Sequence, residues 1–137
     1  MPFARAGNKT IKYFLATIEH YVRWLDEGGN GTPKVREKDR LLDLHKLTVE
    51  HVYPQSPDAA DRDLECDQLV NSLGNLTILG TGDNDAVGNK GFADKSTVLA
   101  RSTIELNKKI ASKALWTTPE IEARANMLVS AAKKVFN

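Results

Sequence analysis

The sequence predicts an α+β fold in which a short two-stranded hairpin is embedded among several helices. Three observations carry this prediction. Apolar residues recur with helical spacing near the N-terminus, two short runs of β-branched and aromatic residues lie in the middle, and a helix-capping signature precedes the last segment. The 137 residues, 41% of them hydrophobic, suffice for a single domain spanning residues 1–137 with one core.

The first helix is predicted over residues 11–25. Asn8 or Thr10 can cap its start, and the pair Gly28–Gly29 ends it and opens a loop. The charged run 35–46 is expected to hold one or two helical turns. The apolar residues of the first helix share one face, which consists of Ile11, Phe14, Leu15, Ile18, Val22 and Leu25.

Two short strands are predicted in the middle of the chain. Leu47–Tyr53 is rich in β-branched and aromatic residues and ends at Pro54, which cannot continue the hydrogen bonding of a sheet. Asn75–Leu79 has the same character and is followed by a turn-forming cluster at residues 80–84. Between the strands, residues 66–73 are expected to form a short helix after a polar loop.

The rest of the chain is predicted to be helical in separate pieces. Helical structure is expected from about Asn84, with a break near Gly88–Gly91. The last helix begins at a capping box formed by Thr117 and Glu120, with Pro119 in its first turn. Its buried stripe is predicted to consist of Ile121, Ala125, Leu128, Ala132 and Val135.

Composition excludes several classes of protein. The single cysteine, Cys66, leaves no disulfide framework and no cysteine-rich zinc site. No apolar run approaches the roughly 18 residues of a membrane span, and the first residues lack the apolar stretch of a signal peptide. We therefore expect no membrane segment and a cytoplasmic location.

Charge is unevenly distributed, although 19 basic and 18 acidic side chains give the whole chain a net charge of only +1. Residues 58–67 contain five acids and one base, a net charge of −4, whereas residues 86–113 contain six bases and two acids, a net charge of +4. Solvated helix faces explain many such runs. If the basic run is more than a solvated face, it is the place where contacts with nucleic-acid phosphates are expected.

Polar residues at three places are candidates for chemistry. Glu50 and His51 are adjacent on the first strand, where neighbouring side chains point to opposite faces, so one of them must reach an accessible edge or cleft. Asn75 opens the second strand, where it could make only a structural hydrogen bond, and Asn84 lies at a helix start, where it could be only a cap. Oxygen ligands of this kind suit Mg²⁺, and a neutral imidazole beside the ion can take a proton from water.

These residues lie in three runs, TVEHVYPQS, GNLTIL and DNDAVGNKGFADK. Together the runs resemble a ββα-metal (HNH) nuclease, whose core would be residues 48–95. The nine-residue step from Asn75 to Asn84 is similar to that in the HNH domains of RNA-guided DNA nucleases. The similarity is closer to the C-terminal domain of GmrSD-type modification-dependent restriction enzymes, over residues 11–136. The cysteine pairs that brace many HNH domains with zinc are absent from this sequence. The matching features outside these runs are the helix IKYFLATIEHY, the series Asn84, Asn89, Phe92 and Lys95, and the ending with Trp116, Ile121 and Arg124.

The resemblance implies roles for individual residues. His51 would be the general base that activates water, and Glu50 would bind one divalent ion, Mg²⁺ or Mn²⁺. Asn84 would be a catalytic residue and the second metal ligand, with Asn89 as a rival that spacing alone does not separate from it. Asn75 would be a catalytic residue that orients the loop carrying His51.

The basic run would supply the DNA contacts, through Lys90, Lys95 and Arg101. The implied function is that of a metal-dependent DNA endonuclease, the nuclease module of a restriction or antiviral defence protein. Its partners would be DNA and an N-terminal nucleotide-hydrolysing domain of the same protein, and two copies could pair to cut both strands. The alternatives are a catalytically silent HNH-shaped module that binds DNA or protein, and a purely structural helical domain.

Overall fold

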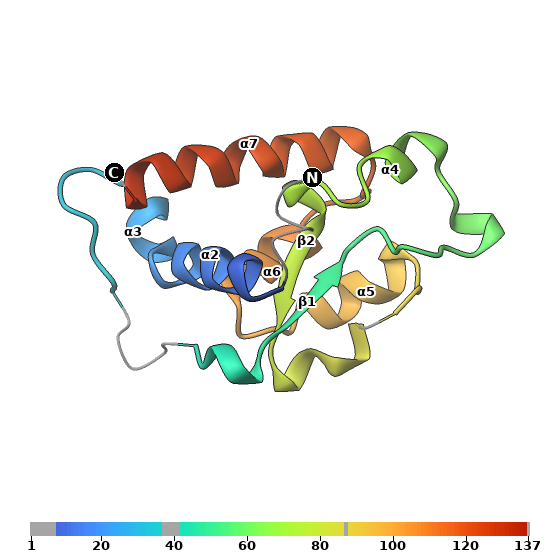
Figure 1. Cartoon of the computed structure of the whole chain (residues 1–137), viewed down its shortest axis with the longest axis horizontal. Coiled ribbons are helices and arrows are strands. Elements are labelled where there is room, and N and C mark those ends of the chain that lie inside the picture. The colour runs from blue at the N-terminus through green and yellow to red at the C-terminus, as the bar shows by residue number, and fades with distance from the viewer. Residues whose placement is uncertain (1–7, 37–41, 87, 137) are drawn as a thin grey trace.

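The predicted α+β class is confirmed in a computed structural model of the chain, which describes residues 8–36, 42–86 and 88–136. Within those residues, six α-helices surround a two-stranded antiparallel sheet, and short 3-10 turns connect several of them. Figure 1 shows the two strands near the centre of the molecule and the long last helix along its top edge. The elements are α2 (Asn8–His20), α3 (Val22–Asp26), β1 (Thr48–His51), α4 (Leu64–Gln68), β2 (Leu76–Leu79), α5 (Phe92–Leu99), α6 (Glu105–Ala111) and α7 (Thr118–Val135), with 3-10 turns η2 (Leu44–Lys46), η3 (Ala59–Asp61), η4 (Leu73–Asn75) and η5 (Thr81–Ala86).

The strand β2 is buried on both of its faces. All four of its residues are buried, although within the described residues β1 is its one partner strand. Because successive side chains of a strand point to opposite sides, Leu76 and Ile78 pack into one apolar cluster while Leu79 packs into a second. The remaining residue on the second side, Thr77, donates a hydrogen bond to Oδ1 of Asn107 on α6. The sheet therefore divides the core into two parts.

The two apolar clusters join different sets of helices. The first is formed by side chains of α2, β2, the start of α6 and the second half of α7, and the second by the chain after β1 together with α4, α5, α6 and the start of α7. The buried members of the second cluster are Val52, Tyr53, Cys66, Leu79, Ala86, Leu99, Ile110, Trp116 and Ile121. This second cluster lies directly beneath the end of β1, where the candidate residues are found.

The predicted first helix differs from the observed one. It is divided at Tyr21 into α2 and α3, and it ends near Gly28 as predicted. The interruption is a tight turn in which the backbone N–H of Tyr21 bonds to the carbonyl of Ile18 at 3.1 Å. After this turn the indole of Trp24 is buried, and its Nε1 donates to the carbonyl of Asn30 at 3.2 Å. Tertiary burial of Trp24 thus accompanies a break that the apolar spacing did not indicate.

Other predicted elements are confirmed with changed lengths. The capping box of Thr117 and Glu120 is present at the start of α7. The helix expected at 66–73 lies earlier, as α4, because the carboxylate of Asp63 accepts hydrogen bonds from two backbone N–H groups of its first turn. Of the charged run expected to be helical, the structure shows only the turn η2, and residues 37–41 lie outside the described part. No helix within the described residues is long and apolar enough to cross a membrane.

His20, the last residue of α2, connects this helix to the chain at Leu42 through a hydrogen bond. Its Nε2 accepts a hydrogen bond from the backbone N–H of Leu42 at 2.9 Å, so this contact requires the neutral imidazole. Burial lowers the pKa of His20 below its ordinary value of 6.5. The contribution of this contact to the stability of the fold is therefore complete above the ordinary pKa of histidine, and it is lost as the pH falls through the lowered pKa of His20 in the folded state.

We therefore expect the wild type to lose more thermal stability on acidification from about pH 7.5 to about pH 5 than a His20→Gln variant, which cannot titrate at this position. The Tm measured by circular dichroism at several pH values tests this. His45→Gln is the matched control, because His45 lies on η2 with an exposed side chain, and it should keep the wild-type pH dependence. Parallel curves for wild type and His20→Gln would contradict the prediction.

Candidate active site

The candidate site is centred on the end of β1. His51 is the last residue of this strand and pairs with Leu76, and Glu50 pairs with Thr77. The two adjacent side chains therefore leave the strand on opposite faces, and both are half-buried. Beyond His51 the ladder continues for one hydrogen bond, from the backbone N–H of Val52 to the carbonyl of Asn75 at 2.9 Å.

The carboxylate of Glu50 is held by two backbone N–H groups. Its Oε1 accepts from the N–H of His51 at 3.0 Å, and its Oε2 accepts from the N–H of Gly88 at 2.8 Å. The second bond spans 38 residues and fastens the segment after η5 to the strand. Each carboxylate oxygen has further acceptor capacity after one such bond. The carboxylate is therefore fixed in position and can still bind a cation.

The imidazole of His51 is held by a residue that the sequence analysis did not identify. Its Nε2 lies 3.0 Å from Oδ1 of Asn71, which is half-buried in the turn between α4 and η4. The two residues are 20 positions apart. No local pattern marks Asn71, since only the folding of this turn against β1 brings it to the histidine.

Asn75 fixes the backbone that immediately follows His51. It is fully buried, and its amide makes four hydrogen bonds of 2.8 to 3.0 Å. Oδ1 accepts from the N–H of Tyr53 and from Nε1 of Trp116, and Nδ2 donates to the carbonyls of Tyr53 and Val70. These contacts hold the backbone that follows His51, and the catalytic role that the resemblance implies for Asn75 stays a prediction.

Lys95 occupies a different place from the expected one. Its side chain is 1% exposed, and its Nζ donates to the carbonyl of His51 at 2.7 Å. Burial lowers the pKa of this ammonium, and the nearby carboxylate of Glu50 opposes that shift. Because α5 packs this residue beneath β1, Lys95 supports the backbone of His51 instead of facing a phosphate at the surface.

The two asparagines proposed as metal ligands are only partly described. Asn84 lies in η5, but its side chain is outside the described part of the structure. Asn89 is exposed, and its Oδ1 accepts from the N–H of Ser56 at 3.2 Å. Since the neighbouring Gly88 is bonded to Glu50, the segment carrying both asparagines reaches the candidate site. The role of each as a metal ligand stays a prediction.

The other two residues expected to contact DNA are exposed. Lys90 donates from Nζ to the carbonyl of Asp85 at 2.8 Å, and it is two residues after Gly88, which is bonded to Glu50. Arg101 follows the C-terminal end of α5, whereas Lys95 is in the first half of that helix. Both side chains are exposed, and their contact with DNA phosphates stays a prediction.

The donor atoms at this site are oxygens. Among the described residues, no group of three or more His, Cys, Asp or Glu side chains could hold a metal ion. The carboxylate of Glu50 is bonded to Gly88, on the segment that carries Asn84 within η5 and Asn89 after it. Mg²⁺ takes one or two carboxylates and completes its shell with water and substrate phosphate, so this donor set fits a hard divalent cation.

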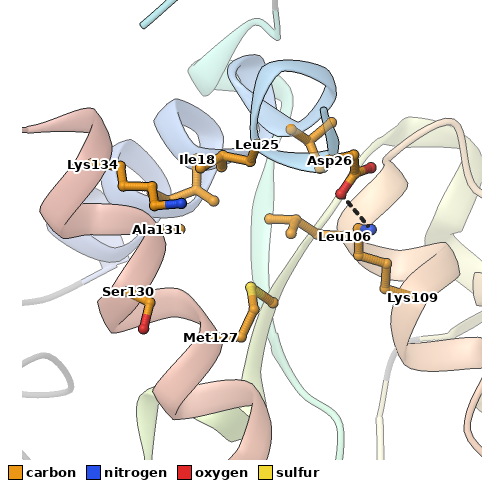
Figure 2. Close-up of a pocket in the computed structure, with 10 residues that line it drawn as sticks. Ile18, Leu25, Asp26, Leu106, Lys109, Met127, Ser130, Ala131 and Lys134 are labelled. Carbon is orange, nitrogen blue, oxygen red and sulfur yellow. Dashed lines mark hydrogen bonds and ion pairs between the residues drawn. The ribbon is translucent and has the colours of Figure 1, made fainter. Parts of the chain in front are cut away.

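One cavity is lined by residues that follow His51, and another lies between helices. A cavity of about 500 Å³ is lined by Val52, Tyr53 and Pro54, which directly follow His51, and by residues of α5 and of the chain before α7. Figure 2 shows the other, of about 220 Å³, between the helices α2, α3, α6 and α7, with the ion pair of Asp26 and Lys109 at its rim. It is lined mainly by apolar side chains, and none of its lining residues belongs to β1.

Comparison with known proteins adds one match. The model of the family described as GmrSD restriction endonucleases, C-terminal domain, matches residues 1–131 of this chain. No curated protein matches it.

Proposed function

This chain belongs to the family of GmrSD restriction endonuclease C-terminal domains, and from that membership we propose that it is a metal-dependent HNH nuclease that hydrolyses DNA phosphodiester bonds. The family indicates a nuclease module of a restriction enzyme, with DNA as the substrate and a further domain in the full protein. The metal dependence and the HNH chemistry are our proposal. In support, β1, β2 and α5 occur along the chain in the order of a ββα motif, with α4 and two 3-10 turns between the strands.

The observation that carries the proposal is the arrangement of Glu50 and His51. A carboxylate fixed by two backbone N–H groups and a half-buried imidazole belong to successive residues at the end of a strand. The backbone around the imidazole is held from both sides, by Lys95 at the carbonyl of His51 and by Asn75 at Tyr53. Such rigid placement is what a general base needs, because its effect depends on the geometry of proton transfer.

In this proposal the residues have separate roles. The carboxylate of Glu50, together with an oxygen of Asn84 or Asn89, would hold one divalent cation. When bound, such a cation supplies charge stabilisation for the scissile phosphate. The neutral imidazole of His51 accepts the proton of a water molecule as that water attacks phosphorus, and Lys90 and Arg101 bind flanking phosphates of the DNA backbone.

Calorimetric titration of the chain with Mn²⁺, combined with a plasmid cleavage assay, tests this function. We expect Mn²⁺ to bind and to support conversion of supercoiled plasmid, and EDTA to stop it. Glu50→Gln keeps the shape of the side chain and one of its two accepting oxygens but removes the charge. Loss of a group that only supports a metal ligand costs about 10–100-fold in affinity, so loss of this carboxylate should weaken Mn²⁺ binding by at least that factor.

Glu122→Gln is the matched control, because Glu122 is exposed on α7, and it should bind Mn²⁺ and cut plasmid as the wild type does. Nicked and linear products would distinguish cleavage of one strand from cleavage of both. If the chain shifts DNA in gels but neither binds Mn²⁺ nor cuts, it is a DNA-binding module and the proposed function is wrong.

A further inference from the structure

The contact between Asn71 and His51 has a chemical consequence for the imidazole. A neutral imidazole has one N–H and one bare nitrogen, and an amide oxygen can only accept a hydrogen bond. Oδ1 of Asn71 lies 3.0 Å from Nε2 of His51, so a hydrogen bond between these two atoms requires the proton to be on Nε2. Nδ1 is then the bare nitrogen, and among the described residues it has no hydrogen-bond partner.

The turn that carries Asn71 is tied to the strand that carries His51. The amide of Asn75 donates to the carbonyl of Val70, next to Asn71, and also to the carbonyl of Tyr53, two residues after His51. The N–H of Ser72, on the other side of Asn71, bonds to the carbonyl of Leu69 at 2.9 Å. The buried side chain of Asn75 thus holds the turn of Asn71 against the chain that follows His51. This places Asn71 within reach of the imidazole.

We propose that Asn71 is a positioning residue, which fixes the ring orientation and the tautomer of His51 so that Nδ1 is the atom that accepts the proton of the attacking water. The catalytic half of this inference rests on the proposed nuclease function. Proton transfer to Nδ1 breaks one O–H bond of water as the water oxygen bonds to phosphorus and the leaving oxygen departs. The ring then carries N–H groups at both nitrogens, and Asn71 continues to accept from Nε2.

The tautomer can be observed without any activity. Long-range ¹H–¹⁵N correlation spectra, recorded at a pH where the ring is neutral, separate a protonated from a bare ring nitrogen. We expect the wild type to show His51 with its proton on Nε2. Asn71→Asp keeps an accepting oxygen and should preserve this tautomer, whereas Asn71→Leu, of similar size but without an acceptor, should give a mixture of both.

Cleavage of plasmid provides the second measurement. Supporting contacts to catalytic groups are worth about 10–100-fold, so Asn71→Leu should lower kcat by about that factor while KM for DNA and the affinity for Mn²⁺ are unchanged. Asn71→Asp should restore part of the loss. Asn126→Leu, at an exposed position of α7, is the matched control and should resemble the wild type in both measurements.

The two hypotheses fail in different ways. A wild-type His51 with its proton on Nδ1, or an Asn71→Leu variant with an unchanged tautomer and unchanged kcat, would overturn the role of Asn71 even if the chain cuts DNA. A wild type that has the expected tautomer but cuts no DNA would refute the nuclease function and with it the catalytic half of the inference, while the positioning of the ring by Asn71 would stand.

Discussion

A His51→Ala variant is expected to lose the metal-dependent cleavage of plasmid DNA while it stays folded. The proposed role of His51 is to take a proton from the attacking water, and a positioned general base contributes about 10²–10⁴-fold to a rate. The ring of His51 is half-buried at the end of a strand, and it is hydrogen-bonded to the side chain of Asn71. Because the ring is not part of either apolar cluster, its removal should leave the core intact. Initial rates of nicking in Mg²⁺ or Mn²⁺ measure the effect.

Two comparisons make this result specific. His45→Ala removes an exposed imidazole from η2 and should cut as the wild type does. Gel shifts and Mn²⁺ calorimetry on His51→Ala should show that DNA and metal still bind, since Glu50 and the exposed cations are unchanged. A His51→Ala protein that cuts at the wild-type rate would remove His51 from the mechanism.

Gly74→Ala is expected to have the largest effect on stability. A Cβ at this glycine would lie 1.9 Å from the carbonyl oxygen of Ile121 and 2.9 Å from the backbone nitrogen of Ala125. Both atoms belong to the backbone of α7, which cannot move aside as a flexible side chain can. Overpacking ordinarily costs about 1–3 kcal/mol, and we expect the upper end of that range or more, a fall in Tm of roughly 10 °C.

Gly82→Ala is the matched control for this prediction. Gly82 is exposed in η5, and a Cβ built there meets nothing within 4 Å. Its effect should stay within about 0.5 kcal/mol, as for other surface substitutions. Thermal unfolding of the two variants under the same conditions decides the matter, and equal Tm values for them would show that η4 and α7 are not in the close contact described here.

The position of Gly74 connects stability with the candidate site. Nη1 of Arg124, a buried residue of α7, donates to the carbonyls of Gly74 at 3.1 Å and Leu76 at 2.6 Å. Burial lowers the pKa of this guanidinium to about 10. The next residue, Asn75, holds the backbone after His51. Displacement of η4 by a methyl group at Gly74 should therefore also reduce cleavage, because it shifts the segment that positions the imidazole.

Local sequence patterns predicted several elements well. The two strands, the interruption before α5 and the capping box at Thr117 are all found close to their predicted positions. In these places the signal lies within a few neighbouring residues: β-branched side chains, Gly88 with a φ of 102°, and a side chain that bonds to the backbone three residues away. The buried stripe of α7 was only partly right, since Arg124 and Ala131 are buried as well as Ile121 and Leu128.

Long-range packing decided what local patterns did not. The spacing of apolar residues gave no reason for the break at Tyr21, which accompanies the burial of Trp24. A lysine in a basic run was expected at the surface, yet Lys95 is buried against the carbonyl of a residue 44 positions away. Burial of an ammonium has a large free-energy cost in general. Here the hydrogen bond from Lys95 to the carbonyl of His51 offsets part of that cost.

By itself the sequence determined the α+β class, the two strands and the pair Glu50 and His51 at the end of the first, because these depend on residue type and on short spacing. The tertiary structure alone decided which atoms hold that pair: Gly88 at the carboxylate, Asn71 at the imidazole and Lys95 at the backbone. Each of these contacts joins residues at least 20 positions apart. Such contacts form when packed elements bring distant segments together, and no single segment of the chain contains the information.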